Sequence, residues 1–319
     1  MGRYILRRLL INIPILFVIT IIVFLLVEIA PGDMVDFFIT EETEAFLTPE
    51  ALEEMRDRFG LNDPLPVRYF KWLGRTLQGD FGFSYIQSYP VGALLLQRLQ
   101  NSAILTGTGM LIAIVVGVPL GIITALRQYS TLDFTLTGLS FVGMSMPAFI
   151  SGIIGLYIFA VQLHWVPAGG MTTPGRTSTL DLLHHLILPA TILALIHGAR
   201  FMRYTRFSML EVLNQDYVVT ATAKGMRRLI VINRHALRNA LIPVVTVIGL
   251  SVSNIVAGAV FLETIFSWPG IGRLYYNAVI SQDYPVIMAA NLVIAVAVLA
   301  TNLITDIAYA VVDPRVRYE

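Results

Sequence analysis

The 319-residue chain contains no cysteine and few charged residues. Without cysteine it can form neither disulfide bonds nor thiolate metal sites, and it has no thiol nucleophile. Charged residues make up 13% of the sequence and hydrophobic residues 56%, which is too little charge to cover the surface of a soluble protein of this length. The net charge of +1 says nothing about nucleic acid, because the charges are unevenly distributed along the chain; we expect membrane lipid and no nucleic acid as a partner. The apolar excess instead predicts contact with lipid.

Six long stretches between charged residues have the length of a membrane-spanning helix, which needs about 20 mostly apolar residues. They are Leu9 to Ala30, Ala103 to Leu126, Phe134 to Leu163, Leu182 to Ala199, Asn239 to Leu262, and Tyr284 to Thr305. The first has no small-x-small cleavage site before Pro31, so we interpret it as a retained span rather than a secretory signal. The sequence therefore predicts an all-α integral membrane protein with six transmembrane helices.

The distribution of Lys and Arg predicts the orientation of these helices. With the N-terminus inside, the inside segments 1–8, 127–133, 200–238 and 306–319 carry most of the 22 basic residues. Basic residues favour the cytoplasmic side, so both termini are predicted to be cytoplasmic. We accordingly divide the chain into a cytoplasmic N-terminus with the first helix (1–30), an extracytoplasmic segment (31–102) and a five-helix core (103–319).

The extracytoplasmic segment has the signals of a small helical domain. Thr48 is a candidate N-cap, Pro49 suits the first helical position and Gly60 can end the helix. A second amphipathic run follows, and two apolar faces are expected to bury each other; they comprise Leu52, Met55 and Phe59 on the first helix and Val67, Phe70, Leu73 and Leu77 on the second. The segment is either a cap over the helix ends or a docking surface for an external partner.

The segment 200–238 is the longest predicted cytoplasmic loop. Arg200, Arg203 and Arg206 recur every third residue and are expected to contact anionic lipid headgroups. A short helix follows, with Asp216 as candidate cap and Gly225 as terminator. A second helix then leads into the fifth span. Such a helix pair either fits a groove on another protein or is an ordinary basic loop lying on anionic lipid.

The residues of this loop resemble the cytoplasmic coupling motif of permeases in binding-protein-dependent ABC importers, in the version of the dipeptide/oligopeptide branch. The resemblance rests on Asp216-Tyr217, Thr220-Ala221, Ala223-Lys224-Gly225, and Arg234-His235-Ala236-Leu237-Arg238-Asn239-Ala240-Leu241-Ile242-Pro243. Further signatures occur in order along the chain: Pro31-Gly32-Asp33, Phe59-Gly60-Leu61, Gly79-Asp80-Phe81-Gly82, Ser145-Met146-Pro147, Leu188-Pro189-Ala190, Trp268-Pro269-Gly270-Ile271-Gly272-Arg273 and Asp313-Pro314-Arg315. The resemblance therefore covers nearly the whole length.

The chain departs from the family pattern within the short helix and just after it, and Val219 and Thr222 stand where the peptide branch often has basic residues. Thr220-Ala221-Thr222 stands where the broader motif has Glu-Ala-Ala, and Arg227-Arg228 replaces a small-then-acidic pair. These departures bear on which ATPase partner the chain accepts.

The resemblance implies a division of labour among several subunits. An external solute-binding protein delivers the solute, a second homologous permease completes the pore as a heterodimer, and two cytoplasmic ATPases drive the cycle. We call residues 216–239 the coupling region; the resemblance assigns ATPase coupling to Asp216, Tyr217, Thr220, Ala221, Ala223, Lys224, Gly225, His235, Arg238 and Asn239. The expected location is the cytoplasmic (inner) membrane of a bacterium or archaeon.

The sequence carries no enzyme motif. It has no Gly-x-x-x-x-Gly-Lys-Ser/Thr loop, so ATP and Mg are expected on the partner ATPases and no cofactor on this chain. It has no His-Glu-x-x-His pair, and we expect no catalytic residue and no metal site. The rival interpretation is an ion-coupled secondary transporter, which usually has ionisable residues near the middle of the membrane. Here Glu28, Glu263 and Asp306 lie toward the ends of their segments.

The solute path is the least defined feature of the sequence. Asn254, Asn291 and Asn302 lie within predicted spans and line the route or form hydrogen bonds between helices. Pro119 and Pro147 are candidate gating kinks, although proline in a span is also tolerated for structural reasons. The sequence does not identify the solute; the resembled branch handles dipeptides, oligopeptides and related small molecules.

Overall fold

Long apolar runs with few breakers produce long helices in the computed structural model, which describes residues 2–30, 48–58, 60–84, 86–176 and 178–312. The helices are α1 (Gly2–Ile29), α3 (Pro49–Arg58), α4 (Leu65–Leu77), α5 (Val91–Leu126), α6 (Thr131–Ser145), α7 (Ala148–Gly155), α8 (Thr179–Leu213), α9 (Asp216–Ala223), α10 (Arg228–Ile230), α11 (Arg238–Gly258), α12 (Val260–Ile265), α13 (Ile271–Ile280) and α14 (Tyr284–Val312). Two π-helical turns, η2 (Leu156–Gln162) and η3 (Val231–Leu237), continue α7 and α10. The strands β1 (Phe83–Ser84) and β2 (Tyr89–Pro90) form one antiparallel pair, with Phe83 opposite Pro90.

Four described helices are long and apolar enough to cross a membrane. They are Leu6–Ile29, Val91–Leu126, Thr179–Leu213 and Tyr284–Ile307, and the pair formed by Thr131–Ser145 and Ala148–Gln162 adds a fifth if it counts as one span. The predicted span from Asn239 to Leu262 falls on α11 and α12 and includes residues 252–258, whose side chains lie outside the described part of the chain, so this span stays a prediction. The multi-pass helical class is therefore confirmed, while six spans and the sidedness of the termini stay predictions.

The third predicted span is not one straight helix. A bend of 104° separates α6 from the helix that begins at Ala148, and the break falls at Met146 and Pro147. Met146 has extended backbone angles, as expected for a residue before proline, and Pro147 occupies the N-cap position of α7. The kink predicted at Pro147 therefore lies where the helix breaks, because proline ends the first helix, and a single span from Phe134 to Leu163 stays a prediction.

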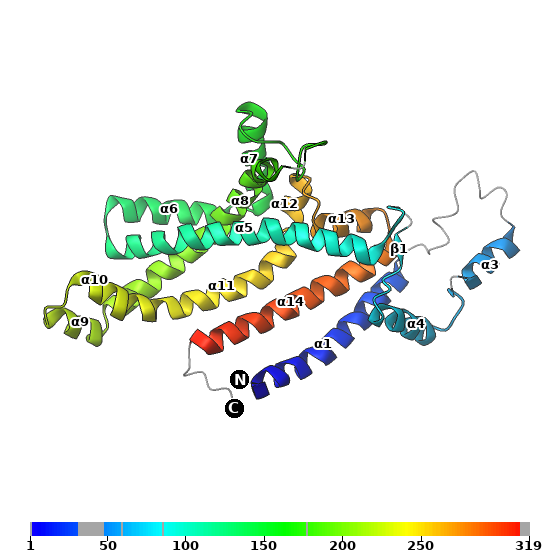
Figure 1. Cartoon of the computed structure of the whole chain (residues 1–319), viewed down its shortest axis with the longest axis horizontal. Coiled ribbons are helices and arrows are strands. Elements are labelled where there is room, and N and C mark those ends of the chain that lie inside the picture. Colours follow the sequence, from blue (N-terminus) through cyan, green and yellow to red (C-terminus); the bar gives the residue numbers. More distant parts are fainter. Residues whose placement is uncertain (1, 31–47, 59, 85, 177, 313–319) are drawn as a thin grey trace. The chain divides into compact units, whose positions relative to one another are not determined.

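The chain folds as two compact units: Met1–Leu6, Arg98–Leu274 and Ala297–Glu319 form the first, and Arg7–Gln97 with Tyr275–Val296 forms the second. In the first unit α6 and α11 pack against α8 (Figure 1). Helix α5 also meets α8 at close range, because a Cβ added to Gly117 or Gly121 would lie 2.5 Å from a carbonyl oxygen of α8. Small residues allow such close approach between helices in membranes.

A buried ion pair fastens α6 to α8. Arg206 Nε donates to Asp133 Oδ1 at 2.6 Å, and its terminal nitrogen donates to Oδ2 at 2.8 Å. Arg203 lies over the ring of Phe141, 5.5 Å from its centroid. Both guanidinium groups thus contact side chains of α6, which the sequence did not indicate, and contact with lipid headgroups stays a prediction.

Replacing Asp133 with Asn is expected to lower the free energy of unfolding by about 2 kcal/mol, since the charge-assisted pair is lost from a site where only 3% of the carboxylate side chain is exposed. Thermal unfolding of the purified chain in detergent measures the change. Glu54→Gln is the matched control, because the Glu54–Arg58 pair is exposed and should contribute little. Equal effects of the two substitutions would contradict a structural role for the buried pair.

In the second unit, helices α3 and α4 begin as the sequence predicts. Thr48 Oγ1 accepts a hydrogen bond from the Ala51 N–H at 3.3 Å, α3 starts at Pro49, and Gly60 has a φ of +68°. However, the predicted apolar face of α4 is not buried: Leu77 is 79% exposed, and Val67 and Phe70 are also exposed.

The opposite side of α4 packs against α1 instead. Tyr69 is buried and its hydroxyl is 2.8 Å from Thr20 Oγ1. The Tyr69 ring makes edge contacts with Phe17 and Phe24. Arg68 on this side forms an ion pair with Glu28 at 2.5 Å. The prediction that the apolar faces of α3 and α4 bury each other is therefore wrong for α4, whose partner is the first long helix.

Candidate functional site

The short helix α9 begins after Gln215, which occupies the N-cap position without a side-chain cap. Asp216, predicted as the cap, is instead the first helical residue. Its carboxylate still lies in the first turn, where negative charge favours the positive end of the helix dipole. The expected cap is therefore wrong by one residue, while the helix itself lies where the sequence predicts it.

Gly225 ends α9 as the sequence predicts. Its φ is +76°, a left-handed conformation that glycine adopts without steric cost. The Met226 N–H donates to the Ala221 carbonyl at 3.4 Å, and the Gly225 N–H donates to the Thr222 carbonyl at 3.0 Å. These two bonds define a Schellman motif, which fixes the direction in which the chain leaves the helix.

One face of α9 is buried against its neighbours. Val218 and Ala221 form a small apolar cluster with Val231, the first residue of η3. Val212 and Leu213, at the end of α8, and Met226 pack around this cluster. The slim side chain of Ala221 allows the helix to lie close to the chain beneath it.

A second cluster connects the same region to three long helices. It contains Ala125 of α5, Met209 of α8, Ile232 and Ala236 of η3, and Ala240 of α11. In addition, Ser208 Oγ donates to the Ala240 carbonyl at 2.8 Å. Packed side chains therefore connect the region around α9 to α5, α8 and α11.

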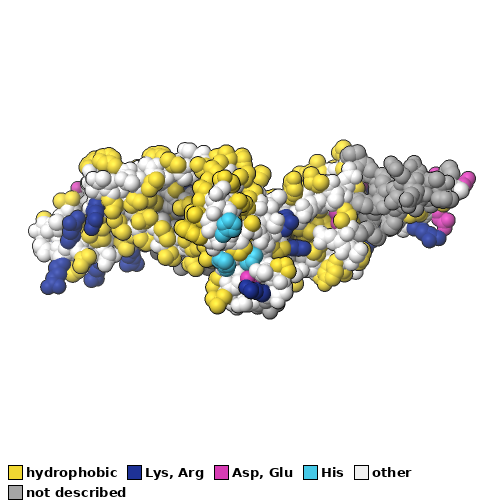
Figure 2. All heavy atoms as spheres, turned by 90° about the horizontal axis from the view of Figure 1, so that it is seen from above, with side chains coloured by type: hydrophobic (Ala, Val, Ile, Leu, Met, Phe, Trp, Pro, Cys, Tyr) yellow, Lys and Arg dark blue, Asp and Glu magenta, His cyan; other side chains and the backbone are white. Residues whose placement is uncertain are grey.

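The other face of α9 is exposed. Tyr217 is 42% exposed and Val219 56% exposed. Thr220 and Thr222 direct their hydroxyl groups to their own helix, with bonds of 2.8 Å to the Asp216 carbonyl and 2.9 Å to the Val218 carbonyl. This surface thus offers methyl and aromatic groups more than free hydroxyls. Lys and Arg side chains gather at the end of the first unit formed by α9 and α10 (Figure 2).

The structure brings several residues of the coupling region together. Asn239 Nδ2 lies 2.9 Å from the Tyr217 hydroxyl and 3.0 Å from the His235 carbonyl, so one side chain bridges the two helices. His235 is half-buried, whereas Ala223, Lys224 and Arg238 are exposed. The helix predicted after Gly225 is continuous with the fifth predicted span, because α10, η3 and α11 follow without a gap.

Sequence reasoning missed Leu229 and Ile230, which extend the exposed apolar surface beyond α9. Leu229 is 73% exposed and Ile230 43% exposed. Both directly follow Arg227-Arg228 and lie outside every predicted span. The signal in the sequence that could have identified this surface is a pair of large apolar residues in a predicted cytoplasmic loop.

The residues predicted for the solute path and for gating are not brought together in one site of the described structure. Asn291 lies in the second unit and donates to the Ile287 carbonyl of its own helix at 3.0 Å. Asn302 lies in the first unit, and the side chain of Asn254 is outside the described residues. Helix α5 continues through Pro119, whereas Pro147 stands at the bend between α6 and α7. A gating role for either proline stays a prediction.

Comparison with known families gives matches along almost the whole chain. The family described as binding-protein-dependent transport system inner membrane component matches residues 117–318. Residues 1–106 match the N-terminal component of such transport-system membrane proteins.

Individual relatives agree with these matches. A protein of Brucella suis named as a peptide permease protein is 47% identical over 320 residues, covering 99% of both chains. The oligopeptide transport system permease protein AppB of Bacillus subtilis is 43% identical and covers 100% of both. Among solved structures, an inward-facing MetNI methionine ABC transporter matches with a TM-score of 0.58 and 16% identity, over 70% of this chain and 98% of that one. The last likeness concerns the fold alone.

Proposed function

The chain belongs to the family of binding-protein-dependent transport system inner membrane components, the permease subunits of ABC importers, and from this membership we propose that it imports peptides or a related small solute. In this proposal it forms half of a pore, and a second, homologous permease forms the other half. Two cytoplasmic ATPases hold ATP and Mg, and an extracytoplasmic binding protein delivers the solute. The location is the cytoplasmic membrane of a bacterium, since the helices are long, apolar and repeated along the chain.

The coupling region is the mechanical link in this proposal. One observation carries it: α9 is packed on one face through Val218, Ala221 and Val231, while Tyr217 and Val219 on its other face are exposed. A buried face ties the helix to the pore, and an exposed face is available to an ATPase. Ala221 and Gly225 provide the close packing and the fixed exit of the helix. Tyr217, His235 and Asn239 hold the two helices of the region together.

Alternating access follows from a difference in binding free energy. The coupling region can drive the spans from one state to the other only if the ATP-bound ATPases bind it better in one state, because a partner with equal affinity for both shifts nothing. Packing through α8, η3 and α11 then converts that preference into movement of the long helices.

Transport in vesicles tests the proposal against ion-coupled transport. We expect the complex, reconstituted with its partners, to take up peptide after all ion gradients have been collapsed, and to stop when ATP is withheld. Uptake that follows an imposed proton or sodium gradient without ATP would establish the rival. Full uptake by the purified chain alone in liposomes would also contradict the proposal, because transport would then not require the ATPase subunits.

A further inference from the structure

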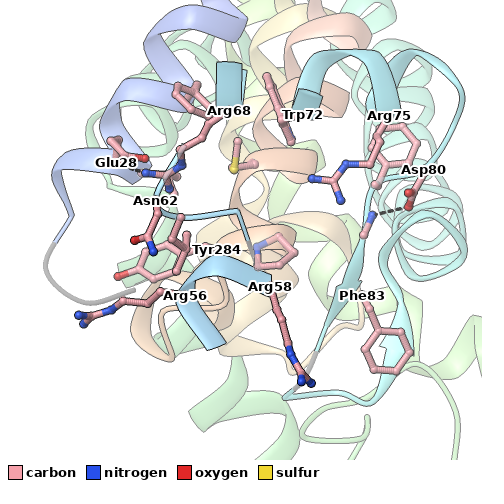
Figure 3. Close-up of a pocket in the computed structure, with 17 residues that line it drawn as sticks. Glu28, Arg56, Arg58, Asn62, Arg68, Trp72, Arg75, Asp80, Phe83 and Tyr284 are labelled. Carbon is pink, nitrogen blue, oxygen red and sulfur yellow. Dashed lines mark hydrogen bonds and ion pairs between the residues drawn. The ribbon is translucent and has the colours of Figure 1, made fainter. Parts of the chain in front are cut away.

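A cavity of about 600 Å³ lies entirely within the second unit, at a distance in sequence from the coupling region. Its walls come from the end of α1, from α3 and α4, from the loop before β1, and from the start of α14 (Figure 3). Its volume falls within the range of about 300–1,000 Å³ that is usual for small-molecule sites. A pocket of this size holds a ligand as large as a short peptide but not a folded protein.

The charge of the cavity walls is predominantly positive. Four arginines line it, Arg56, Arg58, Arg68 and Arg75, against the two carboxylates of Glu28 and Asp80. Glu28 is paired with Arg68 at 2.5 Å, and Asp80 accepts a hydrogen bond from the Gly82 N–H at 2.9 Å. Both carboxylates are therefore already engaged.

Arg75 is the arginine best placed to receive a ligand. Figure 3 shows its guanidinium reaching in from α4 between Trp72 and Asp80. Arg68 has Glu28 and Arg58 has Glu54 as ion-pair partners, whereas no acidic partner of Arg75 occurs in the described ranges 2–30, 48–58, 60–84, 86–176 and 178–312. A guanidinium binds carboxylates through two parallel hydrogen bonds when the geometry permits.

The rest of the lining is apolar and aromatic. Phe24, Trp72 and Phe83 contribute rings, and Pro285 and Met288 contribute aliphatic surface. Apolar walls with a few convergent polar groups are typical of small-molecule sites. A ligand that satisfies this lining needs an apolar body as well as an anionic group, which separates it from inorganic phosphate.

A hydrogen bond next to the cavity joins two segments of its wall. Ser84 Oγ donates a hydrogen bond to the buried carboxylate of Asp283, which joins β1 to the residue before α14. Burial raises the pKa of the Asp283 carboxyl, and the Ser84 hydroxyl opposes that shift by stabilising the charged form. This bond connects β1, which carries Phe83, to the start of α14, which carries Tyr284, and both residues line the cavity.

We propose that this cavity binds a short peptide or similar small molecule that carries a carboxylate beside an apolar group, with Arg75 as the residue that binds the carboxylate. The site is separate from the coupling region and does not require ATP. Binding here therefore goes beyond the transport function proposed above, and its failure would leave that function untouched.

The test uses the full-length chain in nanodiscs of phosphatidylcholine, with N-acetyl-Phe-Asp as probe and the neutral N-acetyl-Phe-Asn-amide as control. We expect the probe to change the fluorescence of Trp72, and Trp72→Phe to remove that change while calorimetry still detects binding. Arg75→Gln should weaken binding about tenfold, since it removes a charge-assisted contact. Arg75→Lys should give an intermediate loss, because lysine keeps the charge but not the paired geometry.

Arg176→Gln is the matched control, because Arg176 is exposed and does not line the cavity. Equal binding of the neutral analogue, or equal losses from Arg75→Gln and Arg176→Gln, would overturn the proposal. Competition by inorganic phosphate at the same concentration would show a simple anion site and would also overturn it. Loss of binding when phosphatidylglycerol is added would assign the cavity to a lipid headgroup. The solute-binding protein could instead bind in an Arg75-dependent manner while the probe does not bind. That result would identify the cavity as a docking surface for a protein and would overturn the proposal.

Discussion

Gly225→Pro is expected to reduce ATP-driven uptake by at least about tenfold while the amount of membrane-inserted chain stays near that of the unmodified protein. Gly225 has a φ of +76°, and proline fixes φ near −65°. Proline also lacks the N–H that donates to the Thr222 carbonyl at 3.0 Å. The substitution therefore disrupts the turn that directs the chain from α9 into α10. We expect Val218 and Ala221 of α9 then to lose their packing against Val231. Uptake and ATP hydrolysis measured in the same vesicles would reveal hydrolysis without transport.

Gly175→Pro provides the matched control for this experiment. Gly175 also has a left-handed backbone, with a φ of +82°, and a Cβ at this position would meet open space, as at Gly225. It lies in the loop before α8, outside the coupling region. A general sensitivity to proline at left-handed glycines would lower uptake in both variants. Uptake at the unmodified rate in Gly225→Pro would contradict the role of α9 in coupling.

The sequence predicts the coupling region well because its signals are local. Gly225 ends α9 through its own backbone freedom, and Asp216 lies within one residue of the helix start. Likewise, Thr48 and Gly60 bracket α3 through contacts within a few residues. Caps and terminators depend on neighbours in sequence, so one chain suffices to identify them.

Features that depend on distant partners were predicted poorly. Helix α4 carries two stripes that could be buried, one through Val67 and Phe70 and one through Tyr69 and Trp72. Periodicity alone favours burial of the more aliphatic stripe. The aromatic residues of α1 determine which stripe is buried, since Phe24 packs on both Tyr69 and Trp72. Without the partner in view, an amphipathic pattern gives the helix but not its buried face.

The pairing of Arg206 with Asp133 shows the same limit. The two residues are 73 positions apart, and Asp133 lies just before a predicted span, where an acid is unremarkable. No local signal in the sequence points from Arg206 to an acidic partner on another helix, so the ion pair could not be predicted. The cavity around Arg75 was missed for a related reason, because its lining comes from five separated segments.

Gly121→Leu is expected to prevent correct packing of α5 on α8 and so to abolish the folded protein. A Cβ at Gly121 would lie 2.5 Å from the Met202 carbonyl oxygen and 2.6 Å from Thr205 Cβ. Because the nearest atom belongs to backbone, it cannot move aside as a flexible side chain would. The cost should reach about 3 kcal/mol or more, the upper part of the range for overpacked cores.

Gly107→Leu on the same helix is the control for Gly121→Leu, since a Cβ at Gly107 has nothing within 4 Å. Both substitutions add the same apolar volume and the same helix propensity to α5, so only the close approach to α8 distinguishes them. Thermal unfolding and size-exclusion elution in detergent should show Gly107→Leu near the unmodified protein and Gly121→Leu aggregated or unfolded. If Gly121→Leu unfolded at the same temperature as Gly107→Leu, the tight crossing of α5 and α8 would be refuted. The contact of α5 with α8 would then depend on the cluster around Ala125 and Met209 instead.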